Sequence, residues 1–236
     1  MSTVGNYRGP SIVKNGLVLY LDAATANSYN RYISPATLKD ISGNVNNGAL
    51  TNGPTYNSSN GGSIVLDGVD DSIIINNNSI FPSNTGTWSI WCYYSSTTNR
   101  MTLIQRHSSL SASGIIVYIG SGQNIGTQIY SSDTSQNKLS IGTSGNSLLR
   151  NVWNNVTLAF NNTDQVNLYI NGTLSTSGTP TGTWSFNNQN ITLGTSPDSF
   201  WTKYAGNISN AQIYNRVLTA TEVLQNYNAL KGRFGL

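Results

Sequence analysis

The chain has 236 residues, of which only 9% are charged, and its formal net charge is +3. The 12 Lys and Arg residues are spread along the sequence, which argues against a nucleic-acid-binding surface. No run approaches the roughly 18 apolar residues of a membrane span. Residues 1–10 lack the apolar core of a signal peptide, so we expect neither membrane insertion nor a secretory route.

The composition favours an ordered, all-β domain. Asn, Ser, Thr and Gly are abundant, and they favour turns and strand surfaces over helices. Five Trp, 13 Tyr and five Phe supply large side chains for a core. A domain of this size buries about 70% of its unfolded surface. Such a domain does not need disulfide bonds for its stability. The single Cys92 in any case excludes an internal disulfide and a cysteine-based zinc site.

The N-terminal quarter of the chain is irregular. Residues 1–11 show no periodicity, so we predict an arm outside the core. Strand-like apolar residues begin at Ile12 and resume over 17–21. Residues 23–62 form a long stretch dotted with Asn and Gly, which in a compact domain is typical of an ion-binding loop or a cover over a sheet edge.

Residues 63–75, SIVLDGVDDSIII, predict a strand, a tight acidic turn and a second strand. Residues 87–94 alternate two faces, with Trp88, Ile90 and Cys92 suited to the core. The pair Asn171-Gly172 predicts a hairpin turn. Further short strands are expected at 102–105, 115–119, 127–130, 139–141, 153–160, 165–170, 191–193 and 207–214. This spacing predicts an antiparallel two-sheet jelly-roll sandwich.

One short C-terminal helix is expected. Thr219 and Glu222 have the spacing of a capping box, and apolar residues then recur at helical spacing up to Leu230. Gly232 is suited to end the helix. We therefore predict a single domain over residues 12–230 and a separate C-terminal tail over residues 231–236.

Four stretches in order resemble the laminin-G-like branch of the concanavalin A-like lectin/glucanase superfamily. They are SIVLDGVDDSIII, TWSIWCYY, LRNVWNNVTLAFNNTDQVNLYINGTLSTSG and YAGNISNAQIYNRVLTATEVLQNYNAL. The resemblance covers the whole predicted domain and implies a concanavalin A-like fold.

The N-terminal part resembles a subgroup common among structural proteins of tailed bacteriophages. The segments concerned are GLVLYLDAATANSY and DISGNVNNGALTNGPTYNSSNGGSIVLDGVDD. This resemblance implies a protein on the virion surface, made in the host cytoplasm, that decorates the capsid or belongs to a fibre or appendage. Its partners would be other virion proteins and copies of itself, with a trimer as one arrangement.

Catalytic chemistry is not expected. Glycosidases need two carboxylates about 5 Å apart for retention or about 6.5–9.5 Å apart for inversion. Glu222 is the only Glu, and the capping box accounts for it. His107 is the only His, and its neighbours indicate an exposed loop rather than a catalytic dyad. We therefore predict a protein that is not an enzyme.

Calcium is the one ion for which the sequence offers ligands. Calcium prefers six to eight oxygens from carboxylates, amides and backbone carbonyls. Oxygen-bearing side chains that could contribute to one structural site are Asp40, Asn44, Asn46, Asp67, Asp70 and Asp71. The alternative is that these side chains cap backbone amides in turns. Laminin-G-like relatives often hold structural calcium, but Ser209-Asn210 stands where they often have an acidic residue.

Sugar binding is the alternative function. Aromatic residues in loop-like context are the candidate platforms: Tyr29, Tyr32, Trp201 and Tyr204. With them the chain would act as a carbohydrate-binding adhesion module for a host surface glycan. The competing interpretation is that Trp201 and Tyr204 pack in the interior.

Overall fold

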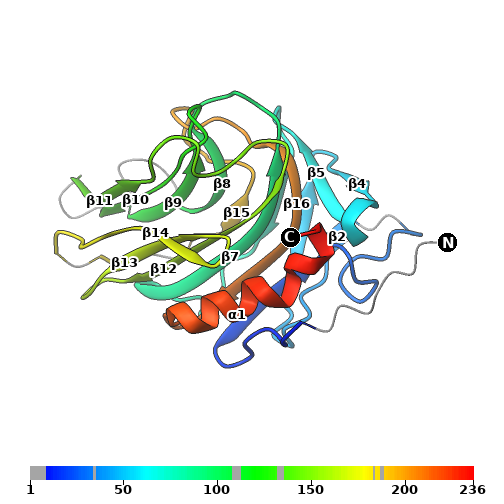
Figure 1. Cartoon of the computed structure of the whole chain (residues 1–236), viewed down its shortest axis with the longest axis horizontal. Coiled ribbons are helices and arrows are strands. Elements are labelled where there is room, and N and C mark those ends of the chain that lie inside the picture. Colours follow the sequence, from blue (N-terminus) through cyan, green and yellow to red (C-terminus); the bar gives the residue numbers. More distant parts are fainter. Residues whose placement is uncertain (1–8, 34–35, 108–112, 132–135, 183, 187–188) are drawn as a thin grey trace.

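The computed structural model describes residues 9–33, 36–107, 113–131, 136–182, 184–186 and 189–236. The prediction of an all-β fold with one short C-terminal helix is confirmed. Two antiparallel sheets, each of eight strands, pack face to face as a jelly-roll sandwich. In Figure 1 the layer with β8 to β11 lies above the layer with β7 and β12 to β14.

The first sheet has the strand order β14-β13-β12-β7-β16-β5-β4, and β1 pairs with β16. Its strands are β1 (Leu17–Asp22), β4 (Thr55–Asn57), β5 (Ser63–Asp67), β7 (Thr85–Tyr94), β12 (Trp153–Asn161), β13 (Val166–Ile170), β14 (Thr173–Gly178) and β16 (Ala205–Tyr214). The predicted hairpin turn joins β13 to β14, and Asn171 and Gly172 both have positive φ as that turn requires.

The second sheet has the strand order β11-β10-β9-β8-β15-β6-β3-β2. Its strands are β2 (Thr37–Leu38), β3 (Gly48–Thr51), β6 (Ser72–Ile75), β8 (Met101–Arg106), β9 (Gly114–Ile119), β10 (Ile125–Ser131), β11 (Gln136–Gly142) and β15 (Ile191–Leu193). A short 3-10 turn, η1 (Ser59–Gly61), precedes β5.

The main core lies between the sheets and is built by alternate residues of each strand. Trp88, Ile90 and Cys92 of β7 all belong to it, as their alternation predicts. Cys92 is fully buried. Burial raises the pKa of the Cys92 thiol to about 12, so this cysteine is a core residue rather than a nucleophile.

A smaller core forms on the outer face of the first sheet, under helix α1 (Ala220–Leu230). The capping box is confirmed, because Thr219 Oγ1 accepts from the amide of Glu222 and the Glu222 carboxylate accepts from the amide of Thr219. The N-terminal segment packs against the helix, where the amide of Val13 donates to Asn226 Oδ1 at 2.8 Å. Figure 1 shows α1 running across this face of the sheet.

The prediction of a separate C-terminal tail is wrong. After α1 the chain forms a 3-10 turn, η2 (Lys231–Phe234), whose Phe234 ring stacks on Trp91 and contacts Trp153, with centroid separations of 4.2 and 4.7 Å. Arg233 forms an ion pair with Asp22 at 2.8 Å. These residues are part of the domain because Phe234 is buried against rings of β7 and β12 and Arg233 is bonded to β1. Of the predicted arm, residues 1–8 lie outside the described part, and the carbonyl of Ser11 accepts from Gln225 on the helix.

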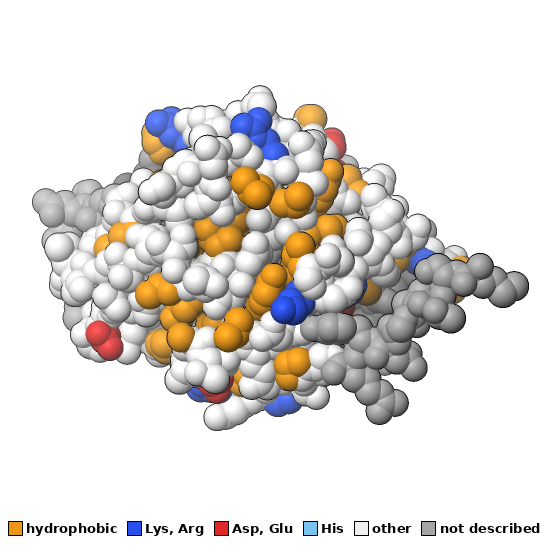
Figure 2. Space-filling model, viewed as in Figure 1, with side chains coloured by type: hydrophobic (Ala, Val, Ile, Leu, Met, Phe, Trp, Pro, Cys, Tyr) orange, Lys and Arg blue, Asp and Glu red, His pale blue; other side chains and the backbone are white. Residues whose placement is uncertain are grey.

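Charged side chains are few and scattered over the face drawn in Figure 2, where hydrophobic side chains form separate patches. Within the described ranges, no helix is long and apolar enough to cross a membrane.

Candidate functional site, a tyrosine groove beside strand β4

The loop that follows β1 is held by side-chain hydrogen bonds to the backbone. Asp22 Oδ1 accepts from the amide of Ala24, and the amide of Asp22 donates to Ser28 Oγ. Ser28 in turn donates to the carbonyl of Lys39 at 2.6 Å. The amide of Tyr29 then closes a turn on Thr25 O. These hydrogen bonds fix the position of Tyr29 within the loop.

Tyr29 stacks on Tyr56 of β4, with a centroid separation of 5.1 Å and an interplanar angle of 18°. Tyr29 is buried at 5% exposure and Tyr56 is partly exposed. The pair forms a wall between two hollows of about 190 and about 500 Å³, both of which are also lined by Arg31. Tyr32 lines the smaller hollow and is 81% exposed. We call the two hollows and their shared wall the tyrosine groove, lined by Tyr29, Arg31, Tyr32 and Tyr56.

A cation stands at the open edge of the tyrosine groove. Arg31 Nη2 donates to the Tyr32 hydroxyl at 3.1 Å, and the guanidinium lies 5.1 Å from the Tyr32 ring centroid. This hydrogen bond raises the pKa of Arg31 and lowers the pKa of Tyr32. Burial, and then the neighbouring Tyr56, raises the pKa of Tyr29. The tyrosine groove therefore combines aromatic surface with a fixed donor.

The other two predicted platform residues are not available to a ligand. Trp201 is 3% exposed and packs on Tyr118, at a centroid separation of 4.8 Å. Tyr204 is fully buried, and its hydroxyl donates to the carbonyl of Tyr93 at 2.8 Å. Their assignment to a glycan platform is wrong, because loop packing buries both rings.

The predicted calcium ligands of the 40–46 segment are used by the protein itself. Asp40 accepts four hydrogen bonds, from the amides of Tyr20, Ser42 and Asn46 and from the Ser42 hydroxyl. Asn44 and Asn46 donate to the carbonyls of Leu17 and Val18. This arrangement ties the loop to β1.

The acidic turn between β5 and β6 brings three carboxylates together. The nearest oxygens of Asp67, Asp70 and Asp71 lie within 4.8 Å of one another. Backbone amides, first that of Val69, lower the pKa of Asp67, whereas burial raises the pKa of Asp71. In the pairing of β3 with β6, Thr51 lies opposite Ser72, so the acidic turn that precedes Ser72 is at this end of the strand pair. Asn46 precedes Gly48, which lies opposite Ile75 at the other end. The two predicted ligand groups thus lie at opposite ends of that strand pair and cannot share an ion.

Sequence reasoning missed two members of the tyrosine groove and misplaced His107. Tyr56 reaches the groove through the pairing of β4 with β5, whereas Arg31 lies on the same loop as Tyr29 and Tyr32. His107, predicted on an exposed loop, is 3% exposed. Tyr56 is the partly buried residue of the three in β4, between exposed Thr55 and Asn57, and a strand of three residues is too short for its alternation to be recognised in the sequence.

The described part of the chain is thus an antiparallel β-sandwich with a tyrosine-lined groove, and no carboxylate is found among the described residues that line this groove. Residues 67–224 match the family model described as the concanavalin A-like lectin/glucanases superfamily. The chain belongs to this family. No match was found among curated proteins.

Solved structures of similar fold include several binding domains. The binding domain of Paraclostridial Mosquitocidal Protein 1 matches with a TM-score of 0.69 at 21% identity, over 92% of this chain and 52% of that one. The ligand binding domain of botulinum neurotoxin serotype D, solved with N-acetylneuraminic acid, matches with a TM-score of 0.68 at 19% identity, over 91% of this chain and 51% of that one. Domain 4 of AbnA, an extracellular arabinanase from Geobacillus stearothermophilus, solved with arabinotriose, matches with a TM-score of 0.66 at 20% identity, over 89% of this chain and 98% of that one. This chain thus spans about half the length of the two toxin structures, and at these identities the likeness shows the fold alone.

Proposed function

We propose that this chain is a non-enzymatic carbohydrate-binding module and that the tyrosine groove holds the sugar. The observation that carries the proposal is the stacked Tyr29–Tyr56 wall between two hollows, with Arg31 and Tyr32 at its open edge. Ligand sites combine aromatic lining with a few fixed polar groups. The tyrosine rings offer flat surfaces for sugar C–H groups, and Arg31 offers donors for hydroxyl oxygens.

Two solved structures of the same fold support the class of ligand. Domain 4 of AbnA was solved with arabinotriose, and the serotype D toxin domain with N-acetylneuraminic acid. The engagement of the carboxylates by the protein itself supports a module that is not an enzyme. Glu222 is bonded to Thr219 and Arg216, and Asp67 and Asp71 of the acidic turn accept from backbone amides of the same turn.

The test is a glycan array probed with the full chain, followed by titration of the best ligand. Tyr32→Ala and Arg31→Ala should each weaken binding by about tenfold or more, because each removes a contact at the open edge. Both side chains are exposed, so neither variant should unfold the domain. Phe200→Ala and Arg150→Ala are matched controls, since Phe200 is a 43% exposed aromatic outside the groove. Unchanged sugar binding in both Tyr32→Ala and Arg31→Ala would show that the tyrosine groove is not the sugar site.

We further propose that the module is carried on the outside of a phage particle, on the capsid or on a fibre or appendage. This proposal is supported by the resemblance of the 16–71 region to phage structural proteins. Mass spectrometry of purified particles should detect the chain, with a high copy number for a capsid coat and a low one for an appendage. Light scattering of the purified chain would report whether copies associate as a trimer. Absence from purified particles would contradict the proposal.

A further inference from the structure

A hollow of about 500 Å³, separate from the tyrosine groove, lies at the end of strands β8 and β15. Its floor is Gln105 and Thr192, which are paired across the two strands. Their neighbours Ile104 and Leu193 belong to the main core, so Gln105 and Thr192 face the other side of the second sheet. We call this hollow the His107 pocket.

The floor of the His107 pocket is held by a chain of hydrogen bonds. Gln105 Nε2 donates to Thr192 Oγ1, and Thr192 Oγ1 donates to the carbonyl of Thr195 at 3.0 Å. Gln105 Oε1 accepts from the amide of His107. His107 Nε2 lies 3.1 Å from Ser196 Oγ, and both residues are 3% exposed. The polar groups of the floor are thus fixed before any ligand arrives.

One wall is fixed in the same way. The buried Arg106 donates to the carbonyl of Gln189 at 3.2 Å and to Asn77 Oδ1 at 2.9 Å. Asn190 Oδ1 accepts from the amide of Asn77, at 2.9 Å. Gln189 and Asn190 line the pocket. They bring amide groups, which bind hydroxyls as donor and acceptor together.

Lys203 supplies the positive charge of the His107 pocket. Its Nζ donates to Thr195 Oγ1 at 2.5 Å and to Ser196 O at 3.3 Å. An ammonium group has three donors, so these two bonds hold it in place and leave one N–H for a ligand. No carboxylate lines the pocket within the described ranges, and no ion pair of Lys203 is found there. The nearby Asp198 accepts from the amide of Phe200 at 2.8 Å.

We propose that the His107 pocket binds an acidic monosaccharide, with its anionic group at Lys203 and its hydroxyls at the amide and hydroxyl side chains of the walls. The volume is that of a small-molecule site, too large for a lone ion. A single cation without a carboxylate partner favours an anion, and the excess of neutral donors and acceptors favours hydroxyls. This site is separate from the tyrosine groove and does not depend on it.

The test is an NMR titration of the full chain, observed at the imidazole of its only His. The probes are glucuronate, glucose 6-phosphate, glucose, acetate and inorganic phosphate. The two acidic sugars distinguish a carboxylate from a phosphate ligand. We expect a saturable shift of the His107 signals with at least one of them, and binding about tenfold or more weaker for glucose and for the simple ions.

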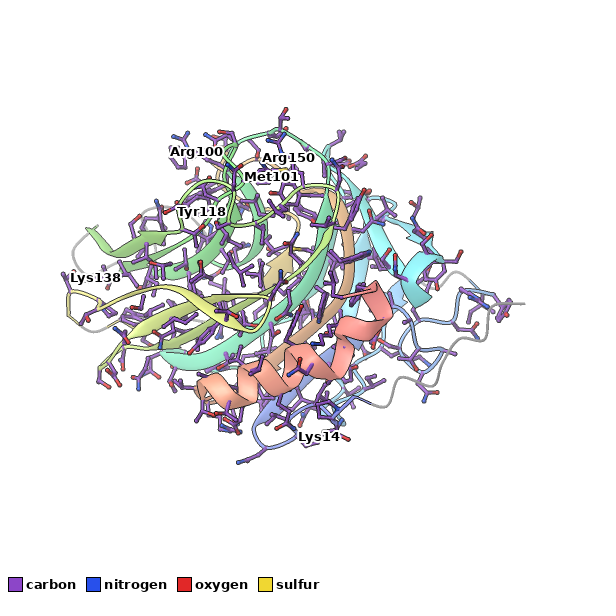
Figure 3. The ribbon with its side chains drawn as sticks, viewed as in Figure 1. Lys14, Arg100, Met101, Tyr118, Lys138 and Arg150 are labelled. Atoms are coloured by element: carbon purple, nitrogen blue, oxygen red, sulfur yellow. The ribbon has the colours of Figure 1, made fainter. Side chains whose placement is uncertain are left out.

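Lys203→Met should weaken binding of the acidic sugar by about tenfold or more, while Lys203→Arg should retain it within about threefold. Lys14→Met removes an equal charge and is the matched control, because Figure 3 places Lys14 on the side of the molecule opposite Arg100. The backbone of Arg100 bonds to that of Thr202, next to Lys203. Thermal melting shows whether Lys203→Met is folded, and Lys203→Arg remains informative if it is not. Tyr32→Ala should leave this binding unchanged, which separates it from the proposed function. No saturable shift, equal binding of glucose, or equal loss in Lys14→Met and Lys203→Met would overturn the proposal.

Discussion

Replacing Arg233 by Met should lower the free energy of unfolding by about 3 kcal/mol, because it leaves a buried carboxylate without its cation. Arg233 Nη1 lies 2.8 Å from Asp22 Oδ1, and the Asp22 side chain is 8% exposed. Removing one partner of a buried ion pair costs about 3–5 kcal/mol. We take the lower end because the Tyr20 hydroxyl and the amide of Ala24 still donate to Asp22.

The loss is measured by urea unfolding, followed by the fluorescence of the tryptophans. In a chain of this size 1 kcal/mol corresponds to about 2–4 °C in Tm, so the expected fall is about 6–12 °C. Arg150→Met is the control and should stay within about 0.5 kcal/mol of the wild type. Asp22→Asn and the double variant Asp22→Asn/Arg233→Met complete a double-mutant cycle.

The double-mutant cycle decides whether the ion pair between Arg233 and Asp22 causes the loss of stability. The double variant should be less destabilised than the sum of the single variants by about 1 kcal/mol or more, because the two side chains are in contact. Additive effects, or a loss below about 1 kcal/mol in Arg233→Met, would refute the reasoning. In that case Arg233 would contribute mainly through its bonds to backbone carbonyls.

Three further predictions concern pH, thiol reactivity and calcium. Hydrogen bonds from Arg216 lower the pKa of Glu222 from 4.5 to about 2, so the contribution of Glu222 to stability is complete above pH 4.5 and is lost as the pH falls toward 2. Tm measured across this window should fall, and less steeply in Arg216→Met; equal slopes would contradict the assignment. Because burial raises the pKa of Cys92 to about 12, the native chain should not react with a thiol reagent, while the chain unfolded in urea should. If the acidic turn binds calcium, CaCl₂ should raise Tm and EDTA should reverse this rise. The rise should be absent in Asp70→Asn. A Tm that changes with neither CaCl₂ nor EDTA would contradict the calcium hypothesis.

The features that sequence predicted correctly depend on local patterns. The alternation around Trp88, the hairpin at Asn171-Gly172 and the capping box at Thr219 each lie within a few residues, where periodicity, turn chemistry and side-chain reach decide the outcome. Together with their order along the chain, these patterns were enough to define the class of fold.

The features that sequence missed depend on contacts between distant segments. Tyr32 and Trp201 look alike in sequence, since each lies among polar loop residues, yet one is 81% and the other 3% exposed. What separates them is the packing of Tyr118 against Trp201. In the same way Phe234 becomes a core residue only because Trp91 presents a ring on the outer face of β7. No pattern within a single segment contains these pairings.

The position of β16 has a consequence for how the chain folds during synthesis. Of the strands in the first sheet β16 is synthesised last, yet it pairs with β1, β5 and β7 in the middle of the sheet. Until β16 leaves the ribosome, the edges of β5 and β7 lack the strand that joins them. Such unpaired edges promote association between chains. We therefore expect the nascent domain to fold late and slowly, in one step after β16 is complete, with chaperones most useful in that interval.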